Sequence, residues 1–145
     1  MIKIELNLKV KNFLLSESNL QKLVNALSKK EKKIKGIVEV NVIGDGEMAK
    51  LNFKFRGKKY PTDVLSFVWG SDGFIPSPYL GQIYICPAQI KRQSKEMGIS
   101  EKEESARMFV HGLLHLAGHE HSEVKEAKKM FGLQEWVLKN LKYVS

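Results

Sequence analysis

The chain has 145 residues, of which 43% are hydrophobic and 28% are charged, and its formal net charge at pH 7 is +8. This length fits a single domain over residues 1–145 and leaves little room for a second independent domain, and no apolar run approaches the roughly 18 residues of a membrane-spanning helix. The alternating start "MIKIELNLKVKN" lacks the apolar segment of a signal peptide, and the single Cys86 has no internal disulfide partner, so we expect a cytoplasmic protein.

The first half of the chain alternates predicted strands with predicted helices. Alternating apolar and polar residues indicate strands, and apolar residues spaced three or four apart indicate helices. Ser18 and Gln21 fit a capping box at the start of the first helix, and a Gly- and Pro-containing loop is expected over residues 70–81. In chain order the predicted elements are strand 2–10, helix 18–30, strand 37–44, helix 47–55, strand 63–69 and strand 81–86.

The second half of the chain is predicted to be helical. Ser100 and Glu103 form a second capping box, and from Phe109 to Ala117 the sequence is apolar nearly all round, which predicts a buried central helix. The pattern as a whole predicts an α+β domain with a small mixed, mostly parallel sheet of about four strands packed against several helices. The predicted helices of this half are 87–98, 100–118 and 122–141.

All four histidines of the chain lie in "HGLLHLAGHEH", residues 111–121. His111 and His115 are four residues apart, so their side chains project from one face of a helix, one turn apart. Gly118 is where this helix is expected to stop, which lets His121 approach from the following loop. Three neutral imidazoles with a free fourth position are typical of catalytic zinc. We therefore predict one zinc ion bound by His111, His115 and His121 on a central helix and the loop after it.

Two further side chains of this segment have less defined roles. His119 is a neighbour of a ligand, a substrate contact or an exposed residue, and we do not assign it to the metal. Glu120 is placed to accept a hydrogen bond from a ligand histidine or to act on water, and a solvated loop glutamate is the alternative. A single histidine on an apolar helix is often an ordinary core residue, but a pair on one face followed by a third after a glycine favours a metal site.

The spacing H-x-x-x-H-x-x-G-x-x-H is also that of the metzincin proteases, which raises the hypothesis of a peptidase. Those proteases carry a glutamate directly after the first histidine as general base. In this chain Gly112 occupies that position. A metal ion could still activate water, but peptide hydrolysis would lack its proton acceptor. The sequence therefore disfavours a peptidase.

Two separated segments, "HGLLHLAGHEH" and "NFKFRGKKYPTDVLSF", resemble the YbeY-type endoribonucleases, also called ribosomal RNA maturation factors. The motifs of that family read H-G-x-L-H-L-x-G-x-D-H, L-N-x-x-x-R-x-x-x-x-P-T-D-V-L-S-F and G-D-I-x-I. The motifs and their order agree over residues 51–121, and chain length and element order extend the resemblance to the whole chain. This chain departs at Glu120, where the family has Asp, and at Gln82, where the family has an acid; any role of an acid at position 82 is therefore in doubt.

The resemblance implies a single-domain hydrolase with one zinc ion. It implies that His111, His115 and His121 are the zinc ligands and that Arg56 is a functional arginine. It also implies a role in ribosomal RNA processing, notably at the 3′ end of the small-subunit RNA, and in ribosome quality control. The partners that it implies are single-stranded ribosomal RNA, the small ribosomal subunit and its assembly factors.

The charge distribution supports an RNA substrate independently of the resemblance. Residues 1–60 hold 14 Lys and Arg against 6 Asp and Glu, whereas residues 61–145 hold 10 of each kind. Arg56, Lys58 and Lys59 lie in a Gly- and Pro-bounded segment where they can meet phosphates. Arg56 is the candidate for stabilising a charged phosphoryl transition state, and a surface salt bridge is its alternative.

Several neighbouring residues are expected to be structural. Thr62, Asp63 and Ser66 are predicted to organise the turn into the following strand, with Asp63 capping or orienting a partner. Cys86 is predicted to lie in the core of its strand. A set of aromatic side chains could stack on bases, but their strand-like alternation favours the core. This set comprises Phe53, Phe55, Phe67 and Trp69.

The main hypothesis from the sequence is a zinc-dependent endoribonuclease specific for single-stranded RNA. The alternatives are an atypical metallopeptidase, disfavoured by Gly112, and a ribosome-assembly RNA-binding factor whose zinc is mainly structural. A metal site with an open position beside a basic cleft would favour the enzyme, and a fourth protein ligand would favour the binding factor. The sequence leaves the cleaved bond, the attacking nucleophile, the physiological metal and the oligomeric state open.

Overall fold

The structure is a computed structural model that describes residues 2–69 and 77–144. Within these residues, no helix combines the length and the apolar character that crossing a membrane requires. Most of the predicted 70–81 loop lies outside the described residues. In chain order the elements are β1 (Ile2–Leu8), α1 (Glu17–Lys30), β2 (Gly36–Val42), α2 (Asp45–Arg56), β3 (Val64–Val68), β4 (Tyr79–Ile85), α3 (Pro87–Met97), α4 (Glu101–Leu116) and α5 (Val124–Asn140).

The four strands form one mixed sheet in the order β1-β2-β4-β3. β1 pairs with β2 and β2 pairs with β4 in parallel, whereas β3 pairs with β4 antiparallel and lies at the edge of the sheet. The α+β prediction of a small, mostly parallel sheet with several helices is confirmed. The order places β3 directly beside α4, the helix that contains two of the histidines.

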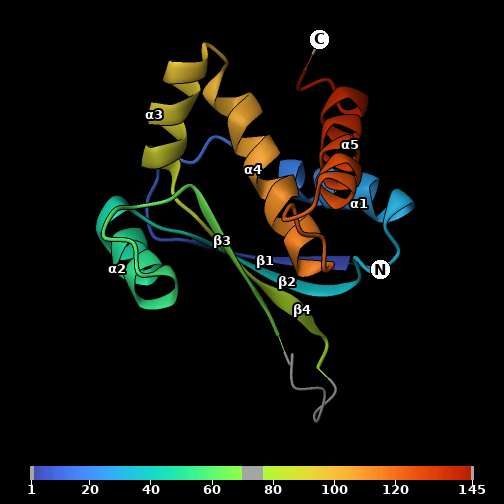
Figure 1. The fold of residues 1–145 in the computed structure, drawn as a ribbon, viewed down its shortest axis with the longest axis horizontal. Helices are drawn as coiled ribbons and strands as arrows, with labels where there is room; N and C mark the ends of the chain where they lie inside the picture. Colours follow the sequence, from blue (N-terminus) through green and yellow to red (C-terminus); the bar gives the residue numbers. More distant parts are fainter. Residues whose placement is uncertain (1, 70–76, 145) are drawn as a thin grey trace.

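The helices lie unequally on the two faces of the sheet. Figure 1 shows α1, α4 and α5 above one face, with α2 at one end of the sheet. The main core fills the space under these three helices, and its fully buried side chains include Phe109, Leu113 and Ile83. A smaller apolar cluster lies at the α2 end. Its buried members are Ile43, Met48, Leu65 and Cys86. The prediction that Cys86 is buried in the core is therefore confirmed.

Helix α4 is the central element of the fold, as its apolar sequence predicts. Ser100 caps its first turn by accepting a hydrogen bond from the backbone N–H of Glu103 at 3.0 Å. At the other end Gly118 has a φ of 91°, a left-handed conformation that glycine adopts at low cost. The N–H of Gly118 donates to the carbonyl of His115, and the next N–H donates to Leu114. This pair of bonds is a Schellman motif, and it turns the chain back toward the helix as predicted.

Two of the predicted capping interactions differ in the structure. The capping box of α1 is formed by Ser16 and Asn19, not by Ser18 and Gln21: the Ser16 hydroxyl accepts from the N–H of Asn19, and the Asn19 side chain accepts from the N–H of Ser16. The asparagine amide oxygen replaces the Glu or Gln of the usual pattern, so α1 begins one residue earlier than predicted. At α4 only half of the box forms, because the Glu103 carboxylate pairs with Arg107 at 2.9 Å.

The expectation that the four aromatic residues lie in the core is wrong for three of them. Phe53 and Phe55 are each 54% exposed and Trp69 is 48% exposed. Phe53 and Phe55 lie in the last turns of α2, so they follow the helical period and not the strand alternation. Phe67 alone is largely covered, since it packs against the smaller apolar cluster.

Gly81 is expected to be intolerant of a side chain. A Cβ at this position would lie 2.4 Å from the carbonyl oxygen of Phe67 and 2.5 Å from a methyl carbon of Leu116. Gly81→Ala would therefore push β3 or α4 away from β4, and we expect it to lower the free energy of unfolding by about 1–3 kcal/mol. Urea unfolding of the variant measures this change. Gly46→Ala is the matched control, because nothing lies within 4 Å of its added Cβ; equal stability of the two variants would contradict the prediction.

Candidate metal centre and adjoining cleft

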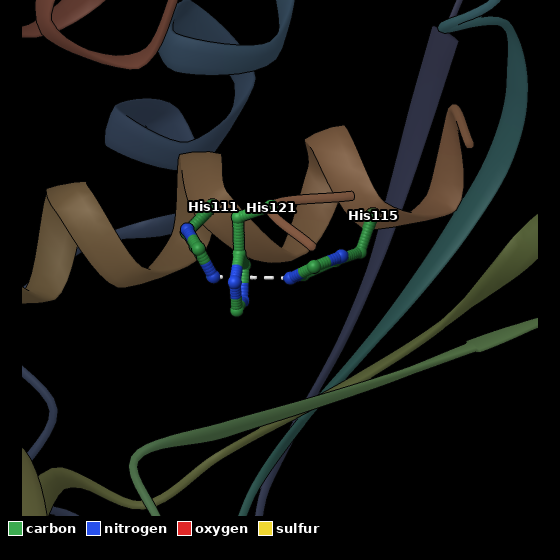
Figure 2. A group of neighbouring side chains, drawn as sticks. All are labelled: His111, His115 and His121. Carbon is green, nitrogen blue, oxygen red and sulfur yellow. Dashed lines mark hydrogen bonds between the residues drawn. The ribbon is translucent and has the colours of Figure 1, made fainter. Parts of the chain in front are cut away.

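Three histidines meet beside β3, where the Schellman turn returns the chain to α4. His111 and His115 project from one face of α4, and His121 approaches from the loop after it, as Figure 2 shows. One ring nitrogen from each residue lies within 4.8 Å of the other two. The Nε2 atoms of His111 and His115 are 3.0 Å apart. The structure thus brings together the three residues predicted as ligands.

The tautomer of His111 is fixed by a chain of hydrogen bonds from α5. The Nδ1 of His111 lies 3.0 Å from Oε1 of the buried Gln134, whose Nε2 donates to Glu135 at 3.0 Å. Arg107 donates two hydrogen bonds to the Glu135 carboxylate and thereby holds the pKa of Glu135 below its usual value. Because an ionised carboxylate only accepts, the Gln134 amide must present its oxygen to His111. In the neutral imidazole of His111, Nδ1 therefore bears the proton and Nε2 has the free lone pair.

The tautomer of His115 is fixed in the same way by a backbone carbonyl. Its Nδ1 lies 2.9 Å from the carbonyl oxygen of His119, which can only accept. The two Nε2 lone pairs of His115 and His111 therefore face each other at 3.0 Å. Two lone pairs at this distance repel each other unless a cation lies between them. Together with His121, this donor set can hold a metal ion.

The environment of His115 also favours the neutral form that a metal ligand requires. Burial is the largest cause that lowers the pKa of His115, and the neighbouring His111 and His121 lower it further. The hydrogen bond to the His119 carbonyl and the charge of Glu120 oppose this shift but do not outweigh it. His115 is therefore deprotonated at Nε2 at neutral pH, so metal binding there does not have to displace a proton.

A cleft of about 510 Å³ opens in front of the three histidines. Arg56, at the end of α2, lines one side of it, and among the described residues its guanidinium forms no ion pair. Glu120 lines the cleft from the loop after α4 that contains His121. Asp63 also lines it, but both of its oxygens accept hydrogen bonds, from the N–H of Val64 at 2.7 Å and from Gln93 at 2.9 Å. The prediction that Asp63 orients the turn into β3 is confirmed.

Lys58 and Lys59 lie in the exposed loop after α2 and do not line this cleft. Gly57 ends α2 with a φ of 70°, and the buried Asn52 then donates from Nδ2 to the carbonyl of Tyr60 at 2.8 Å. This bond fixes the loop against the helix. Both lysines are therefore exposed on the loop that follows Arg56, outside the cleft that Arg56 lines.

His119 is turned away from the cleft. Its Nε2 lies 2.5 Å from a carboxylate oxygen of Glu31, the residue that follows α1, and only 10% of its side chain is exposed. Burial by itself would raise the pKa of Glu31, but hydrogen bonds from His119 and from the N–H of Lys33 outweigh burial and lower it. The Glu31–His119 pair holds the loop after α4 against the end of α1; the two residues are 88 positions apart in the sequence.

Gly112, the position of the missing protease glutamate, faces the sheet and not the cleft. An added Cβ would lie 3.0 Å from Oγ of Ser66 and 3.2 Å from side-chain carbons of Val64 and Ile83. Ser66 also donates to the carbonyl of Gly112 at 2.9 Å, so it joins β3 to α4 instead of organising the turn as predicted. The glycine thus allows close packing of α4 on β3 and β4, and a glutamate does not fit there.

Gln82 lies on the face of the sheet that is remote from the metal centre. It stands beside Glu39 in the parallel β2–β4 register, and its Nε2 donates to the Glu39 carboxylate. It does not line the metal cleft. An acid at position 82 would place a second negative charge beside Glu39, whereas the amide supplies a donor.

A family model described as "Endoribonuclease YbeY" matches residues 5–142. The chain belongs to this family. The predicted resemblance is therefore confirmed, and the family is one of hydrolytic nucleases. The YbeY family match includes all three histidines, Arg56 and Glu120.

Curated relatives of the YbeY family agree with this assignment. The chain is 44% identical over 103 residues to the endoribonuclease YbeY of Ureaplasma urealyticum, a match that covers 71% of this chain and 66% of that protein. It is 40% identical over 111 residues to that of Malacoplasma penetrans, with 75% and 74% covered. It is 47% identical over 87 residues to that of Bdellovibrio bacteriovorus, with 59% and 55% covered. The matched part thus spans less than two thirds of the length of the first and third of these proteins.

A solved structure supports the fold. The solution structure of TM1509 from Thermotoga maritima aligns with a TM-score of 0.64 at 31% sequence identity, over 98% of this chain and 92% of that one. The structural similarity therefore extends over nearly the whole length of both chains.

Sequence patterns did not reveal the outer partners of the histidines. Gln134 lies 23 residues after His111 on a different helix, and Glu31 lies 88 residues before His119. From the sequence alone, Gln134 in an amphipathic helix and Glu31 after a helix are both expected to be solvent-exposed surface residues. The only available signal was that Gln134 falls on the apolar stripe of α5, where a polar side chain needs a partner.

Proposed function

We propose that this chain is a zinc-dependent endoribonuclease that cuts single-stranded RNA. The observation that supports it best is the convergence of the three histidine nitrogens on a cleft that is also lined by Arg56, whose guanidinium forms no ion pair with another described residue. Residues 1–145 act as one metal-dependent hydrolase domain in this proposal. Its setting is the maturation of ribosomal RNA in the cytoplasm, including the 3′ end of the small-subunit RNA, and ribosome quality control.

Zinc is the metal that this donor set fits best. Tetrahedral zinc holds imidazole nitrogens at 2.0–2.1 Å, which places two of them about 3.3 Å apart. The 3.0 Å between the His111 and His115 nitrogens is close to that separation. Among the described residues the candidate ligand group has three members, which leaves a fourth position for water or substrate. Bound zinc would lower the pKa of a water molecule and polarise a phosphate oxygen.

Two residues of the cleft are candidates for the other catalytic roles, which are stabilising the transition state and accepting a proton. Arg56 presents a planar fork of donors that can bind two phosphate oxygens and stabilise the extra charge of the transition state. Glu120 is the cleft carboxylate without a hydrogen bond to another described residue, and it is therefore the candidate for accepting a proton from the attacking group. Asp63 is the weaker candidate for that role because both its oxygens already accept hydrogen bonds.

The substrate in this proposal is single-stranded ribosomal RNA, presented by the small ribosomal subunit and its assembly factors. The excess of 8 positive charges in residues 1–60 supports a polyanionic partner. Lys58 and Lys59 extend the positive charge of Arg56 over the neighbouring surface, where they can contact phosphates on either side of the cleaved bond.

The two alternatives are less well supported. A peptidase would need a general base at position 112, where the glycine packs against Ser66 and Ile83. An RNA-binding assembly factor with structural zinc would need a fourth protein ligand, and the group of candidate ligands in the described residues has three.

The test is cleavage of an end-labelled single-stranded ribosomal RNA fragment by protein of measured zinc content. We expect cleavage to follow zinc content, to stop when zinc is removed and to return when it is restored. His115→Ala should lose both zinc and cleavage, whereas Lys22→Ala, on the exposed side of α1, should keep both. Equal cleavage by wild type and His115→Ala would reveal a contaminating nuclease, and no cleavage by the zinc-loaded wild type would refute the proposal.

Glu31 is expected to influence zinc retention from a distance. Glu31→Ala removes the acceptor of the His119 side chain and so loosens the loop whose carbonyl orients His115. We expect zinc affinity to fall about tenfold, as for other residues behind metal ligands. Competition with a chromogenic chelator measures the affinity. Glu31→Gln keeps an acceptor for His119, so its zinc affinity should stay within a few-fold of wild type. An equal loss of zinc affinity in both variants would show that the charge of Glu31, not its hydrogen bond, is responsible.

A further inference from the structure

An exposed segment beside the cleft has an unusual composition. Residues 53–60 are all exposed, and they contain four cations and no acid. The same segment contains three aromatic residues, Phe53, Phe55 and Tyr60, whose exposed fractions are 54%, 54% and 59%. Folded proteins seldom expose so many large apolar side chains together without a partner. Aromatic rings combined with cations are the composition with which proteins bind single-stranded nucleic acid.

Phe53 is the ring of this segment that is free to stack. Phe55 already packs against Phe67, with ring centres 4.7 Å apart, so it has a structural role. Among the described residues Phe53 has no aromatic partner. It lines a shallow groove of about 300 Å³ together with Ala49, Lys50 and Lys59. The groove thus combines one apolar ring with the side chains of two lysines.

The groove and the cleft in front of the histidines are separate hollows that both adjoin α2. Phe53 follows Ala49 by four residues and precedes Arg56 by three, so these side chains form one stripe on the helix surface. Arg56 at the end of the stripe lines the metal cleft. Asn52 holds the following loop through its hydrogen bond to Tyr60, which keeps Lys59 at the groove. A strand lying in the groove would therefore reach the three histidines past Arg56.

We propose that this groove is a docking site for the single-stranded RNA substrate outside the cleavage site. One base stacks on Phe53, the flanking phosphates lie against Lys50 and Lys59, and the chain continues past Arg56 into the cleft. The inference rests on the proposed function for the identity of the substrate. A duplex cannot bind in this way, because its bases are already stacked and paired.

Equilibrium binding of a fluorescent single-stranded RNA decamer to the full chain tests this proposal without relying on cleavage. We expect Phe53→Leu, which keeps an apolar side chain but removes the ring, to bind about tenfold more weakly, and Phe53→Tyr to bind as wild type does. The slope of log K against log salt should be unchanged in Phe53→Leu. Lys59→Ala should reduce that slope by about 0.7, the value for one phosphate contact on a single strand.

Two controls separate this inference from the proposed function. Lys22→Ala removes a charge on α1 and should change neither affinity nor slope; a duplex decamer should show no difference between wild type and Phe53→Leu. Unchanged RNA affinity in Phe53→Leu would overturn the docking site, as would failure of the wild type to bind single-stranded RNA. Failure of the proposed function would appear instead as zinc-loaded protein that binds RNA through Phe53 and does not cut it.

Discussion

Replacing Arg56 by alanine is expected to lower kcat for RNA cleavage by about 10²–10³-fold while leaving zinc content unchanged. Arg56 lines the cleft with the three histidines, and within the described part of the chain its guanidinium has no carboxylate partner. A guanidinium without a carboxylate partner is available to bind the charge that develops on the phosphate. Its loss should therefore affect the transition state more than RNA binding.

Single-turnover cleavage with excess enzyme measures this effect free of product release. Arg56→Lys is the matched variant: it keeps the charge but lacks the planar fork, so we expect it to recover only part of the lost rate. Arg56→Ala with wild-type kcat and a raised KM would contradict the prediction, because it would reduce Arg56 to a contact that binds substrate and transition state equally.

Replacing Gln134 by leucine is expected to weaken zinc binding by about 10–100-fold. The leucine has a similar volume but removes the acceptor for Nδ1 of His111, so the tautomer with its proton on Nε2 can compete with metal binding. It also leaves the imidazole N–H without a partner in a largely buried site. Chelator competition gives the affinity, and RNA cleavage at saturating zinc should largely recover.

A general loss of stability has to be separated from the expected loss of zinc affinity in Gln134→Leu. Ser94→Ala is the matched control, since Ser94 is also a buried polar residue whose side chain makes a hydrogen bond, to the carbonyl of Lys91 at 2.9 Å, on a helix that does not contribute to the metal site. Both variants should lower the free energy of unfolding, and only Gln134→Leu should lose zinc affinity. Equal zinc affinity in the two variants would rule out the orienting role of Gln134.

Local patterns in the sequence predicted the parts of the site that are local in the chain. The i, i+4 pair His111 and His115 and the glycine stop at Gly118 follow from helix geometry alone, and the structure has both. The capping box of α1 was misplaced because Ser18 and Gln21 fit the usual pattern, whereas the residue that caps the helix, Ser16, has Asn19 in place of Glu or Gln. The class of the sheet was predictable from the order of elements, because parallel neighbours need helical crossovers.

Contacts between distant segments were not predictable in the same way. The pairing of Glu31 with His119 depends on how α1 packs against α4, which no short pattern encodes. The exposure of Phe53 was also missed, since aromatic residues that alternate with polar residues usually face a core. The ring is exposed because α2 lies at one end of the sheet (Figure 1) and Phe53 lies outside both apolar clusters.

The supports of the three histidines come from separate parts of the chain, and this couples metal binding to folding of the whole domain. Glu31 follows α1, Gln134 belongs to α5, and both helices must be docked on α4 before the imidazoles are oriented. An unfolded chain therefore has no preformed site, and the binding free energy adds to the folding free energy. At a free metal concentration 100 times Kd the linkage amounts to about 2.7 kcal/mol. Metal should thus raise the Tm of the entire domain in one cooperative transition, not merely order a loop.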